Sequence, residues 1–303
     1  MPFSFRRKPQ DADHAAADAK SGRRAWLGGR RMLTNTPYIL PKDQAETDRL
    51  DFQHYLLRFV AGGNYRAPIR QPRAILDVAC GTGIWGREMA QQFPRARVVG
   101  FDIDRGPLDR SLKIPGPGGQ FPANFRFQTA DALKPFPFQN ETFDFAHARF
   151  IATFVPIDRW PHVVGEMMRV LKGGGAIEIV DMERPPTNSS PAYRQLSKIG
   201  TQLMIERNLY IGVEDHLVKH LSQAGAQHIQ QRKFTIGTGP QGQQQQQLLA
   251  DDLFAAIEHL KGIITRQGLL SVEVYESLVE QARQEVPQMS ITMPIVFAFG
   301  TKL

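Results

Sequence analysis

Short apolar runs that alternate with amphipathic stretches dominate the chain from residue 74 onward. Each run has the length of a buried strand, and stretches with helical periodicity separate most of the runs. The predicted strands cover residues 74–78, 96–102, 125–132, 142–147, 170–181, 227–236 and 291–299. Because strands that alternate with helices pair in parallel, this pattern predicts an α/β fold in which helices cover both faces of a mostly parallel sheet.

The chain before residue 74 divides into two parts. Residues 1–34 are polar, rich in alanine and glycine and without clear periodicity, which predicts a mostly disordered tail. Asp43, with Glu46 three positions later, is typical of a helix start with reciprocal capping, and a broad apolar helical face follows. Residues 35–73 are therefore predicted to form an ordered helical segment.

Beyond residue 181 longer helical stretches interrupt the alternation of strands and helices. Their periodicity predicts helices over residues 192–210, 214–224, 248–266 and 271–284. We expect residues 185–212 and 238–289 to be insertions in a domain that spans 74–303. The run from Gln243 to Gln247 has low complexity and is predicted to be a flexible linker.

The turn after the first predicted strand has the composition of a ligand-binding loop. Its sequence is Asp77-Val78-Ala79-Cys80-Gly81-Thr82-Gly83, and a helical pattern begins directly afterwards. Glycines permit backbone angles that other residues avoid, and they let a ligand approach the main chain. Unpaired amides at the start of a helix favour an electron-rich group. Many α/β proteins carry such a turn for packing alone, so the turn by itself leaves both interpretations open.

Acidic residues end the first three predicted strands of the domain. These residues are Asp77, Asp102 and Asp131, and His147 ends the fourth strand. Because right-handed crossovers place the carboxyl ends of parallel strands at one edge, we expect the four side chains to meet there. An acid at the tip of the second strand can accept both hydroxyls of a ribose, which favours a nucleotide-like ligand.

Residues 74 to 181 resemble, in the same order, the class I methyltransferases that depend on S-adenosylmethionine (SAM). The stretch Leu76 to Gly83 resembles the first motif of that family, with Ala79 where a glycine is usual. The stretch Leu171 to Gly175 resembles the turn before the fifth strand, with Gly173 where proline is common. The resemblance implies a Rossmann-like, seven-stranded sheet whose last strand is antiparallel, and it implies SAM as the cofactor.

The resemblance also implies which residues contact the cofactor. Asp102 falls on the ribose-binding acid, and Asp131 with Ala132 falls on the position at the adenine edge. The full set that we expect to contact SAM is Tyr38, Asp77, Ala79, Cys80, Gly81, Gly83, Asp102, Ile103, Asp131, Ala132 and His147. The two insertions would emerge at the same edge of the sheet, and we expect them to build the acceptor pocket and its lid.

The segment that contains Tyr38 shows a second resemblance to known proteins. The segment from Tyr38 to Arg58 is similar to the N-terminal segment of methyltransferases related to regulators of fungal secondary metabolism, which carry a similar proline, acid and Arg-Leu pattern. In such proteins this segment packs over the cofactor, which implies a contact between Tyr38 and SAM. An aromatic contact of Tyr38 with the helix itself explains the residue equally well.

His147 is the candidate for a polar contact to the acceptor or for a catalytic base. The methyl group of a sulfonium is already activated, so an enzyme of this kind mainly aligns the acceptor and excludes water. A base or a water path removes any proton on the acceptor, although a histidine at a strand end is often structural. Weaker candidates for the same role are Arg149, His162, Tyr193, Tyr210 and His216. No cluster of cysteines and histidines indicates zinc, and we expect no bound metal.

The residues after the fourth strand narrow the acceptor. The sequence Ala146-His147-Ala148-Arg149-Phe150 differs from the Asn/Asp-Pro-Pro-aromatic sequence with which amino-methylating DNA enzymes hold a flipped base. The only cysteine lies in the glycine turn, away from the position of the nucleophile in cytosine C5 methylation. Paired glutamates of arginine methyltransferases and the magnesium ligands of catechol enzymes are absent. We therefore predict a small-molecule acceptor of specialised metabolism, methylated at carbon or oxygen.

The excess positive charge of the chain is concentrated at its start. The net charge is +7, and residues 1–73 contain 14 Lys and Arg against 7 Asp and Glu, which leaves 23 of each sign in the rest. A basic arm can hold an anionic partner, but a solvated tail is the simpler interpretation. The catalytic body lacks the charge bias that a phosphate backbone requires, so nucleic acid is not the expected partner.

Composition also sets the expected location. No apolar stretch approaches the ~20 residues that a bilayer span needs, and no signal-peptide pattern opens the chain, so we expect no membrane partner. The single cysteine, Cys80, cannot form an internal disulfide, which favours a reducing, cytoplasmic setting.

Two other functions stay open at this level. The domain can bind SAM and act as a regulatory or interaction module, with the basic arm as its contact. It can also methylate RNA or protein with that arm holding the polymer, which predicts strongly salt-dependent binding. The sequence also leaves a homo-oligomer open.

Overall fold

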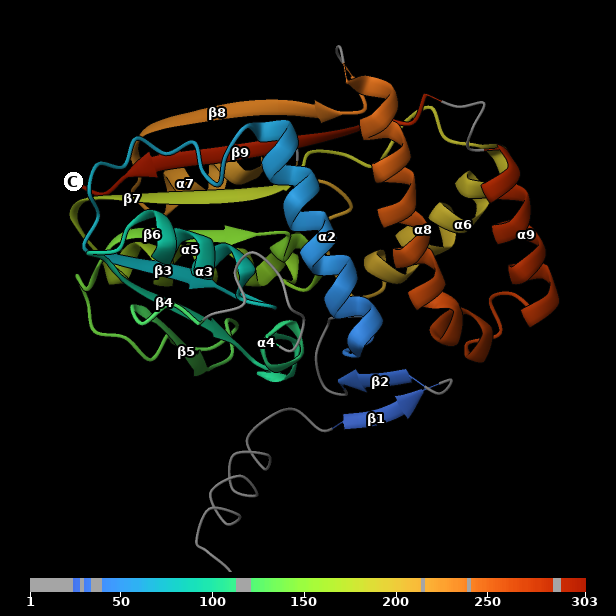
Figure 1. Ribbon diagram of the computed structural model, residues 1–303, viewed down its shortest axis with the longest axis horizontal. Coiled ribbons are helices and arrows are strands. Elements are labelled where there is room, and N and C mark those ends of the chain that lie inside the picture. Colours follow the sequence, from blue (N-terminus) through green and yellow to red (C-terminus); the bar gives the residue numbers. More distant parts are fainter. Residues whose placement is uncertain are drawn as a thin grey trace, which may run out of the picture.

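A seven-stranded sheet forms the centre of the fold. The computed structural model describes residues 40–112, 121–213, 216–238, 241–285 and 290–303, together with the backbone of 24–27 and 30–33. The strands of the sheet are β3 (Ala74–Val78), β4 (Arg97–Asp102), β5 (Phe125–Thr129), β6 (Phe143–Arg149), β7 (Leu171–Met182), β8 (Gln227–Ile236) and β9 (Met293–Thr301). Their spatial order is β5-β4-β3-β6-β7-β9-β8 (Figure 1).

The pairing of the strands confirms the predicted fold class. From β5 to β7 all neighbours pair in parallel, whereas β9 is antiparallel to both β7 and β8. The last strand of the chain, β9, lies between β7 and β8 and is the antiparallel strand that the sequence resemblance implied. The carboxyl ends of β3, β4, β5 and β6 consequently share one edge.

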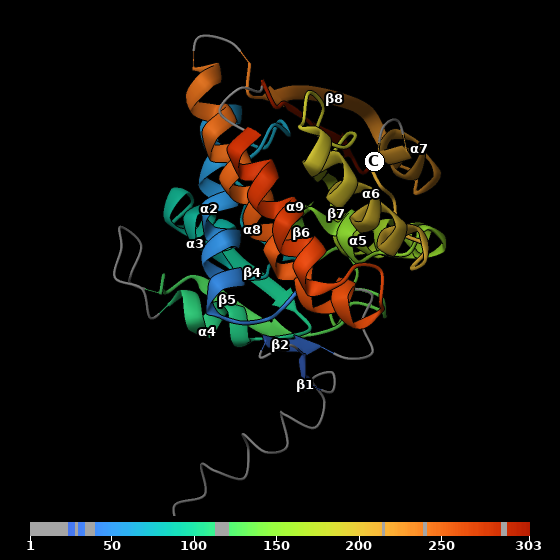
Figure 2. The ribbon, with the colours of Figure 1, turned by 90° about the vertical axis from the view of Figure 1, so that its right-hand side faces the viewer.

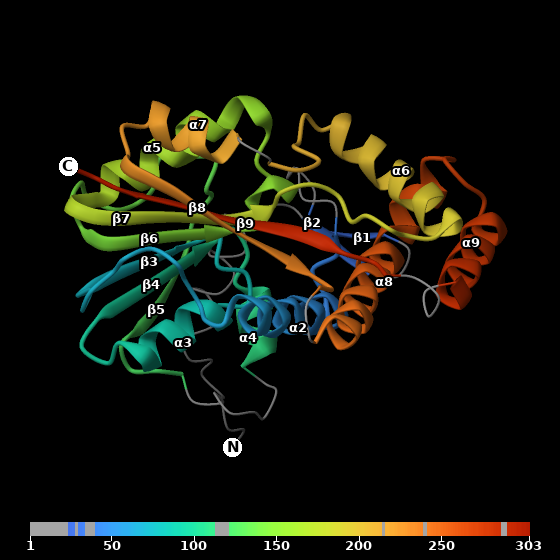
Figure 3. The ribbon, with the colours of Figure 1, turned by 90° about the horizontal axis from the view of Figure 1, so that it is seen from above.

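Helices cover both faces of the sheet, as the sequence pattern predicted. One face carries α3 (Ile84–Gln92) and α4 (Gly106–Ser111), and the other carries α5 (Trp160–Val170) and α7 (His216–Gln223) (Figure 3). Leu76 and Val78 of β3 pack in the core on the side of α5, while Ile75 packs with Trp85 on the side of α3. Successive residues of a strand point to opposite faces, so Asp77 shares the face of Ile75.

Helix α2 (Gln44–Ala61) precedes the sheet in the chain and crosses in front of it (Figure 1). The Asp43 side chain caps the helix by accepting a hydrogen bond of 3.1 Å from the Glu46 amide, which confirms the predicted start. The Glu46 carboxylate was expected to complete a reciprocal cap; it accepts hydrogen bonds from Arg49 and His259. The helix ends at Gly62, whose left-handed φ of 68° suits a residue without a Cβ.

Part of the N-terminal segment departs from the expected disorder. The strands β1 (Arg24–Leu27) and β2 (Arg30–Leu33) pair in antiparallel fashion within residues 1–34. The sequence contains the signal for this pairing, because Gly28-Gly29 separates two runs with apolar residues, as in a short hairpin. The other residues of the predicted tail lie outside the described ranges.

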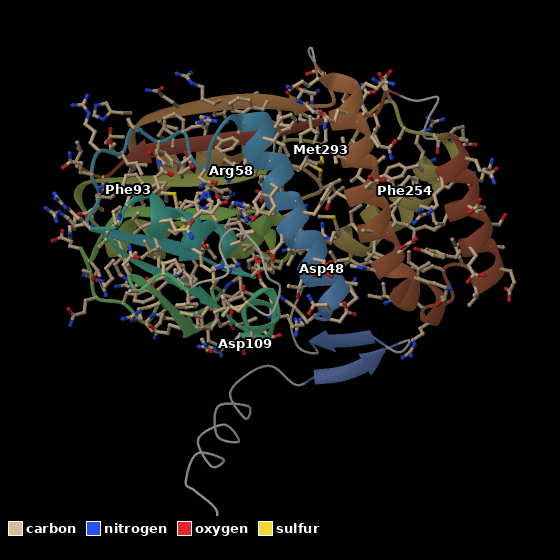
Figure 4. The ribbon with its side chains drawn as sticks, viewed as in Figure 1. Asp48, Arg58, Phe93, Asp109, Phe254 and Met293 are labelled. Atoms are coloured by element: carbon tan, nitrogen blue, oxygen red, sulfur yellow. The ribbon has the colours of Figure 1, made fainter. Side chains whose placement is uncertain are left out.

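Three helices form a layer beyond the carboxyl ends of the parallel strands. They are α6 (Pro191–Ile205), α8 (Gly242–Arg266) and α9 (Val272–Glu285), and they lie beside α2 (Figure 2). Phe254 of α8 and Met293 of β9, both labelled in Figure 4, belong to the apolar cluster that joins this layer to the sheet. The layer contains most of the two stretches that we expected to be insertions.

The run of glutamines at the start of α8 corrects a prediction. Residues 243–247 were expected to form a flexible linker, but they lie inside the helix. Gln245 accepts a hydrogen bond of 3.0 Å from the Gly237 amide, and Gln246 donates one of 2.7 Å to the Gly237 carbonyl. Glutamine has a good helix propensity, and these two bonds fix the run against the preceding turn.

Glu178 of β7 attaches the segment between α2 and β3 to the middle of the sheet. Its Oε2 accepts hydrogen bonds of 2.7 and 2.6 Å from the amides of Arg66 and Ala67. The side chain is fully buried, and burial raises the pKa of Glu178 to about 7. Among the described residues Oε1 has no hydrogen-bond partner, which suits an oxygen that carries the proton.

The raised pKa of Glu178 predicts a stability that decreases with pH. The folded protein binds this proton more tightly than the unfolded chain, whose pKa is 4.5, so stability falls as pH rises from about 4.5 to about 7. One such group contributes at most about 1.4 kcal/mol per pH unit. We expect Glu178→Gln, which keeps an oxygen for the two amides, to reduce this slope in urea unfolding at pH 5, 6 and 7.

Two comparisons make the test of Glu178 specific. Asp181, whose pKa burial also raises to about 7, remains in the variant, so part of the slope should persist. The variant Glu206→Gln changes an exposed acid on the same protein and should keep the wild-type slope. An identical slope for wild type and Glu178→Gln contradicts the assignment.

Candidate active site

A cavity of about 190 Å³ lies at the carboxyl ends of β3, β4, β5 and β6, with residues of α2 in its wall. Most of the residues that the sequence predicts to bind a cofactor line it: Asp77, Ala79, Cys80, Gly81, Asp102, Ile103, Asp131 and Ala132. Gly83 and His147 lie outside this lining, and Tyr38 lies outside the described residues. The structure therefore brings the predicted acids and the glycine turn together in one cavity.

The turn after β3 owes its shape to left-handed backbone angles. Ala79, Gly81 and Gly83 have φ values of 53°, 54° and 69°. Such angles suit glycine, and Ala79 adopts one at the position where the resemblance expects a glycine. Gly83 begins α3, and a Cβ on it would lie 2.9 Å from Leu108 Cδ1, so this glycine serves packing.

Asp102 and Asp131 are held in place by backbone amides. Asp102 Oδ2 accepts a hydrogen bond of 3.0 Å from the Gly81 amide, which ties the tip of β4 to the turn after β3. Its Oδ1 accepts a second bond, of 3.1 Å, from the Asp104 amide. Asp131 Oδ1 accepts a bond of 2.9 Å from the Leu133 amide. Both carboxylates consequently have fixed orientations at the cavity wall.

Asp77 and Cys80 differ from these acids in their surroundings. Asp77 is buried, and its Oδ2 has no hydrogen-bond partner among the described residues. This oxygen faces Gly86 of α3, where a Cβ would lie 3.1 Å from it, so it is packed inside the protein and does not open into the cavity. Burial, together with the carboxylates of Asp77 and Asp102, raises the pKa of the Cys80 thiol well above its usual value. The thiol therefore stays protonated, and it is not a nucleophile.

His147 lies below the cavity and outside its lining, so its catalytic role stays a prediction. The ring is 1% exposed and stacks on Trp85 with centroids 3.8 Å apart. It lies between Asp77 and Glu178, with nitrogen to oxygen distances of 3.8 and 3.9 Å. Burial lowers the pKa of His147, so the ring is neutral beneath the cavity floor. A side chain in this position supports Asp77.

Arg149 is the residue of β6 that lines the cavity, in the place where the sequence analysis expected His147. Because alternate residues of a strand share a face, Arg149 lies on the same face of β6 as His147 and two residues closer to the carboxyl end. It lines the cavity, followed by Phe150, Thr153 and Phe154 from the turn after β6. The period of two along β6 is the signal that identifies Arg149.

Helix α2 contributes a wall that the sequence did not assign residue by residue. Arg49, Leu50 and Gln53 line the cavity. The Arg49 guanidinium pairs with Glu46 and, at 2.8 Å, with Asp252 of α8. Among the described residues, none from α6, α8 or α9 lines this cavity, so the expectation that the insertions build the acceptor pocket stays a prediction. Helix α8 packs against α2 and thereby holds the wall of the cavity in place.

Within the described ranges, no group of three or more His, Cys, Asp or Glu side chains is placed to hold a metal ion. Each helix described is too short or too polar to cross a bilayer.

Comparison with known proteins identifies the domain around the cavity. Residues 75–175 match the family described as methyltransferase domain. The chain contains a methyltransferase domain. Phosphoethanolamine N-methyltransferase 2 of Haemonchus contortus, solved with SAM, aligns with 98% of this chain and 75% of its own, with a TM-score of 0.53 and 16% identity. The domain therefore has the class I methyltransferase fold, and the resemblance found in the sequence is confirmed.

Fungal proteins are similar to this methyltransferase domain in sequence. Methyltransferase str3 of Strobilurus tenacellus is 33% identical over 149 residues, or 49% of this chain and 50% of the relative. The secondary metabolism regulator LAE1 of Cochliobolus heterostrophus is 32% identical over 171 residues, or 54% of this chain and 50% of the relative. The chain thus spans about half the length of these two relatives.

The pair between Arg49 and Asp252 predicts a strong contribution of the α2–α8 contact to stability. Both side chains are buried, with 6% and 3% of their surfaces exposed. We expect Asp252→Ala to lower the free energy of unfolding by about 3 kcal/mol, at the lower end for a broken buried pair because Glu46 remains beside Arg49. Urea denaturation measures the change.

The exposed pair between Lys261 of α8 and Glu276 of α9 provides the matched control. Lys261→Met should cost less than about 1 kcal/mol, because water screens an exposed pair. Similar losses in Asp252→Ala and Lys261→Met contradict a structural role for the buried pair.

Proposed function

We propose that the chain is a SAM-dependent methyltransferase that acts on a small-molecule acceptor of specialised metabolism. The observation that carries this proposal is the row of carboxylates Asp131, Asp102 and Asp77 in one cavity of a methyltransferase domain. The names of the relatives support the reaction and the metabolic setting. Because the chain spans about half of their length, their substrates are not transferred to it.

The residues of the cavity fit SAM along its whole length. Asp102, oriented by the Gly81 amide, offers carboxylate oxygens to the ribose hydroxyls. Asp131 and Ala132 lie at the position for the adenine edge, and the Asp77 carboxylate in the cavity wall places a negative charge near the ammonium group. The other proposed contacts are Ala79, Cys80 and Ile103.

The chemistry of the bound cofactor leaves the protein with few tasks. SAM supplies an activated methyl group, so the chain must align the acceptor and keep water away. The cavity lining, as far as the structure describes it, contains no histidine and no carboxylate beyond the three assigned to the cofactor. We therefore propose an acceptor whose own O–H or C–H is acidic, such as a phenol or an enol, methylated at oxygen or carbon.

A further proposal rests on the sequence alone: a cytoplasmic setting, which the single cysteine favours. A homo-oligomer stays open. The contact of Tyr38 with the cofactor also stays a prediction, because Tyr38 lies outside the described residues.

The assignment of Asp102 predicts a loss of cofactor affinity on its removal. Asp102→Ala should weaken the binding of SAM by about 1–3 kcal/mol, the range for hydrogen bonds to a charged group. Isothermal titration calorimetry measures the affinity. Asp109→Ala removes an exposed carboxylate of α4, labelled in Figure 4, and should leave it unchanged. Equal affinities for wild type and Asp102→Ala refute the assignment.

A regulatory function is the second candidate, and the similarity to the regulator LAE1 favours it. The molecule that receives the methyl group distinguishes a small-molecule methyltransferase from a regulator. Incubation of a fungal extract with the protein and SAM labelled at its methyl group should place the label in the fraction of small organic molecules. Label confined to precipitated protein or RNA favours a macromolecular acceptor and contradicts our proposal. Asp102→Ala serves as the control with reduced transfer.

A further inference from the structure

Arg149 lines the cavity without a carboxylate partner in the described part of the chain. It is partly buried, and its Nη1 lies 2.8 Å from Nδ1 of His54. By contrast, the guanidinium of Arg49 in the same cavity wall is paired with Glu46 and Asp252. Burial lowers the pKa of Arg149, but a guanidinium stays charged at neutral pH. The charges of Asp77, Asp51 and Glu88 act on this guanidinium and raise its pKa, but among the described residues none of these carboxylates forms an ion pair with it.

His54 of α2 orients this guanidinium without neutralising it. The Nε2 of His54 lies 3.0 Å from Glu88, and burial lowers the pKa of His54 to about 4. The ring is consequently neutral at pH 7, and its Nδ1 lone pair accepts the hydrogen bond from Arg149, which leaves the proton on Nε2 near Glu88. This arrangement fixes the direction of the guanidinium and leaves its other donors for a ligand.

The charges along the edge of the sheet follow an order that matches SAM. Along the edge where β5, β4, β3 and β6 end, the charged residues of the cavity are, in that order, Asp131 just after β5, then Asp102, Asp77 and Arg149. SAM has an equally linear order of adenine, ribose, sulfonium, and an amino-acid end with an ammonium and a carboxylate. With the ribose at Asp102, the amino-acid end extends toward β3 and β6, where a negative and a positive side chain stand side by side.

We propose that Arg149 binds the carboxylate of the amino-acid end of SAM and that His54 is its positioning residue. The inference rests on the proposed function, because it takes the ribose to lie at Asp102. A planar guanidinium matches a carboxylate in bidentate fashion, and the partly buried cavity strengthens the pair. The same guanidinium could instead bind a carboxylate on the acceptor molecule. The two ligands of the test below distinguish the carboxylate of SAM from that of an acceptor.

The test compares two ligands that differ in the amino-acid end. S-adenosylhomocysteine carries the carboxylate, whereas 5′-methylthioadenosine has the same nucleoside and sulfur without the amino acid. By calorimetry, Arg149→Met should lower the affinity for S-adenosylhomocysteine about 10- to 100-fold, as expected for hydrogen bonds to a charged group, and leave 5′-methylthioadenosine within about twofold. Arg149→Lys keeps the charge and should lose less.

Arg58→Met is the matched control for a lost guanidinium. Arg58 lies on the same helix as His54 and pairs with the same Glu88, but its side chain is 49% exposed and lies outside the cavity lining (Figure 4). Both ligands should bind this variant with affinities close to those of the wild type.

The positioning role of His54 is tested by the ratio of the affinities for the two ligands, which a general loss of structure would not change selectively. His54→Leu removes the acceptor for Arg149 and should reduce the ratio of the two affinities, S-adenosylhomocysteine over 5′-methylthioadenosine, several-fold. His54→Asn places an oxygen near the former Nδ1 and should restore most of that ratio. A ratio that is the same in wild type, His54→Leu and His54→Asn overturns the positioning role.

The outcomes separate this inference from the function on which it rests. An unchanged affinity of Arg149→Met for S-adenosylhomocysteine overturns the inference and points to the carboxylate of an acceptor. Equal losses for both ligands overturn it as well, because the amino-acid end would then not be the group recognised. A wild-type protein that binds neither ligand contradicts the proposed function itself.

Discussion

The parallel pairing of β3 with β4 and β6 is the constraint on which the candidate site depends. Both faces of β3 are buried, so its interior accommodates apolar residues, and polar groups concentrate where the strands end. The hydrogen bond between Asp102 and the Gly81 amide then joins the tips of β3 and β4 into one unit. Because the strands share direction, this edge collects the acids, the turn and Arg149 in one cavity.

A second constraint fixes the position of helix α2, which forms one wall of that cavity. Helix α2 meets the sheet edge through its own polar residues, and the buried group of Arg49, Glu46, Asp252 and His259 fastens it to α8. Helix α8 thereby acts on the site indirectly, through the position of α2. Arg49 has both roles, because it lines the cavity and also pairs with Asp252 of α8.

The sequence predicted the site residues that lie at the ends of strands. It did not predict the contacts between segments that are distant in the chain. Asp77, Asp102 and Asp131 line the cavity because each ends a parallel strand, a feature that periodicity and spacing indicate. Sequence spacing did not show that His147 lies below the edge and outside the cavity lining, because it does not reveal the depth of a side chain. The approach of His54 to Arg149 joins residues 95 positions apart, which no local pattern indicates.

The sequence by itself determined the α/β class, the antiparallel last strand by family resemblance, and the start of α2, since each depends on local periodicity, capping or motif. It did not determine that the glutamine run is helical or that α8 packs against α2. Those features depend on which surfaces become buried together, as with Gln245 against Gly237 and Arg49 against Asp252. Only the tertiary structure decides such contacts, because burial changes the cost of leaving a polar group unpaired.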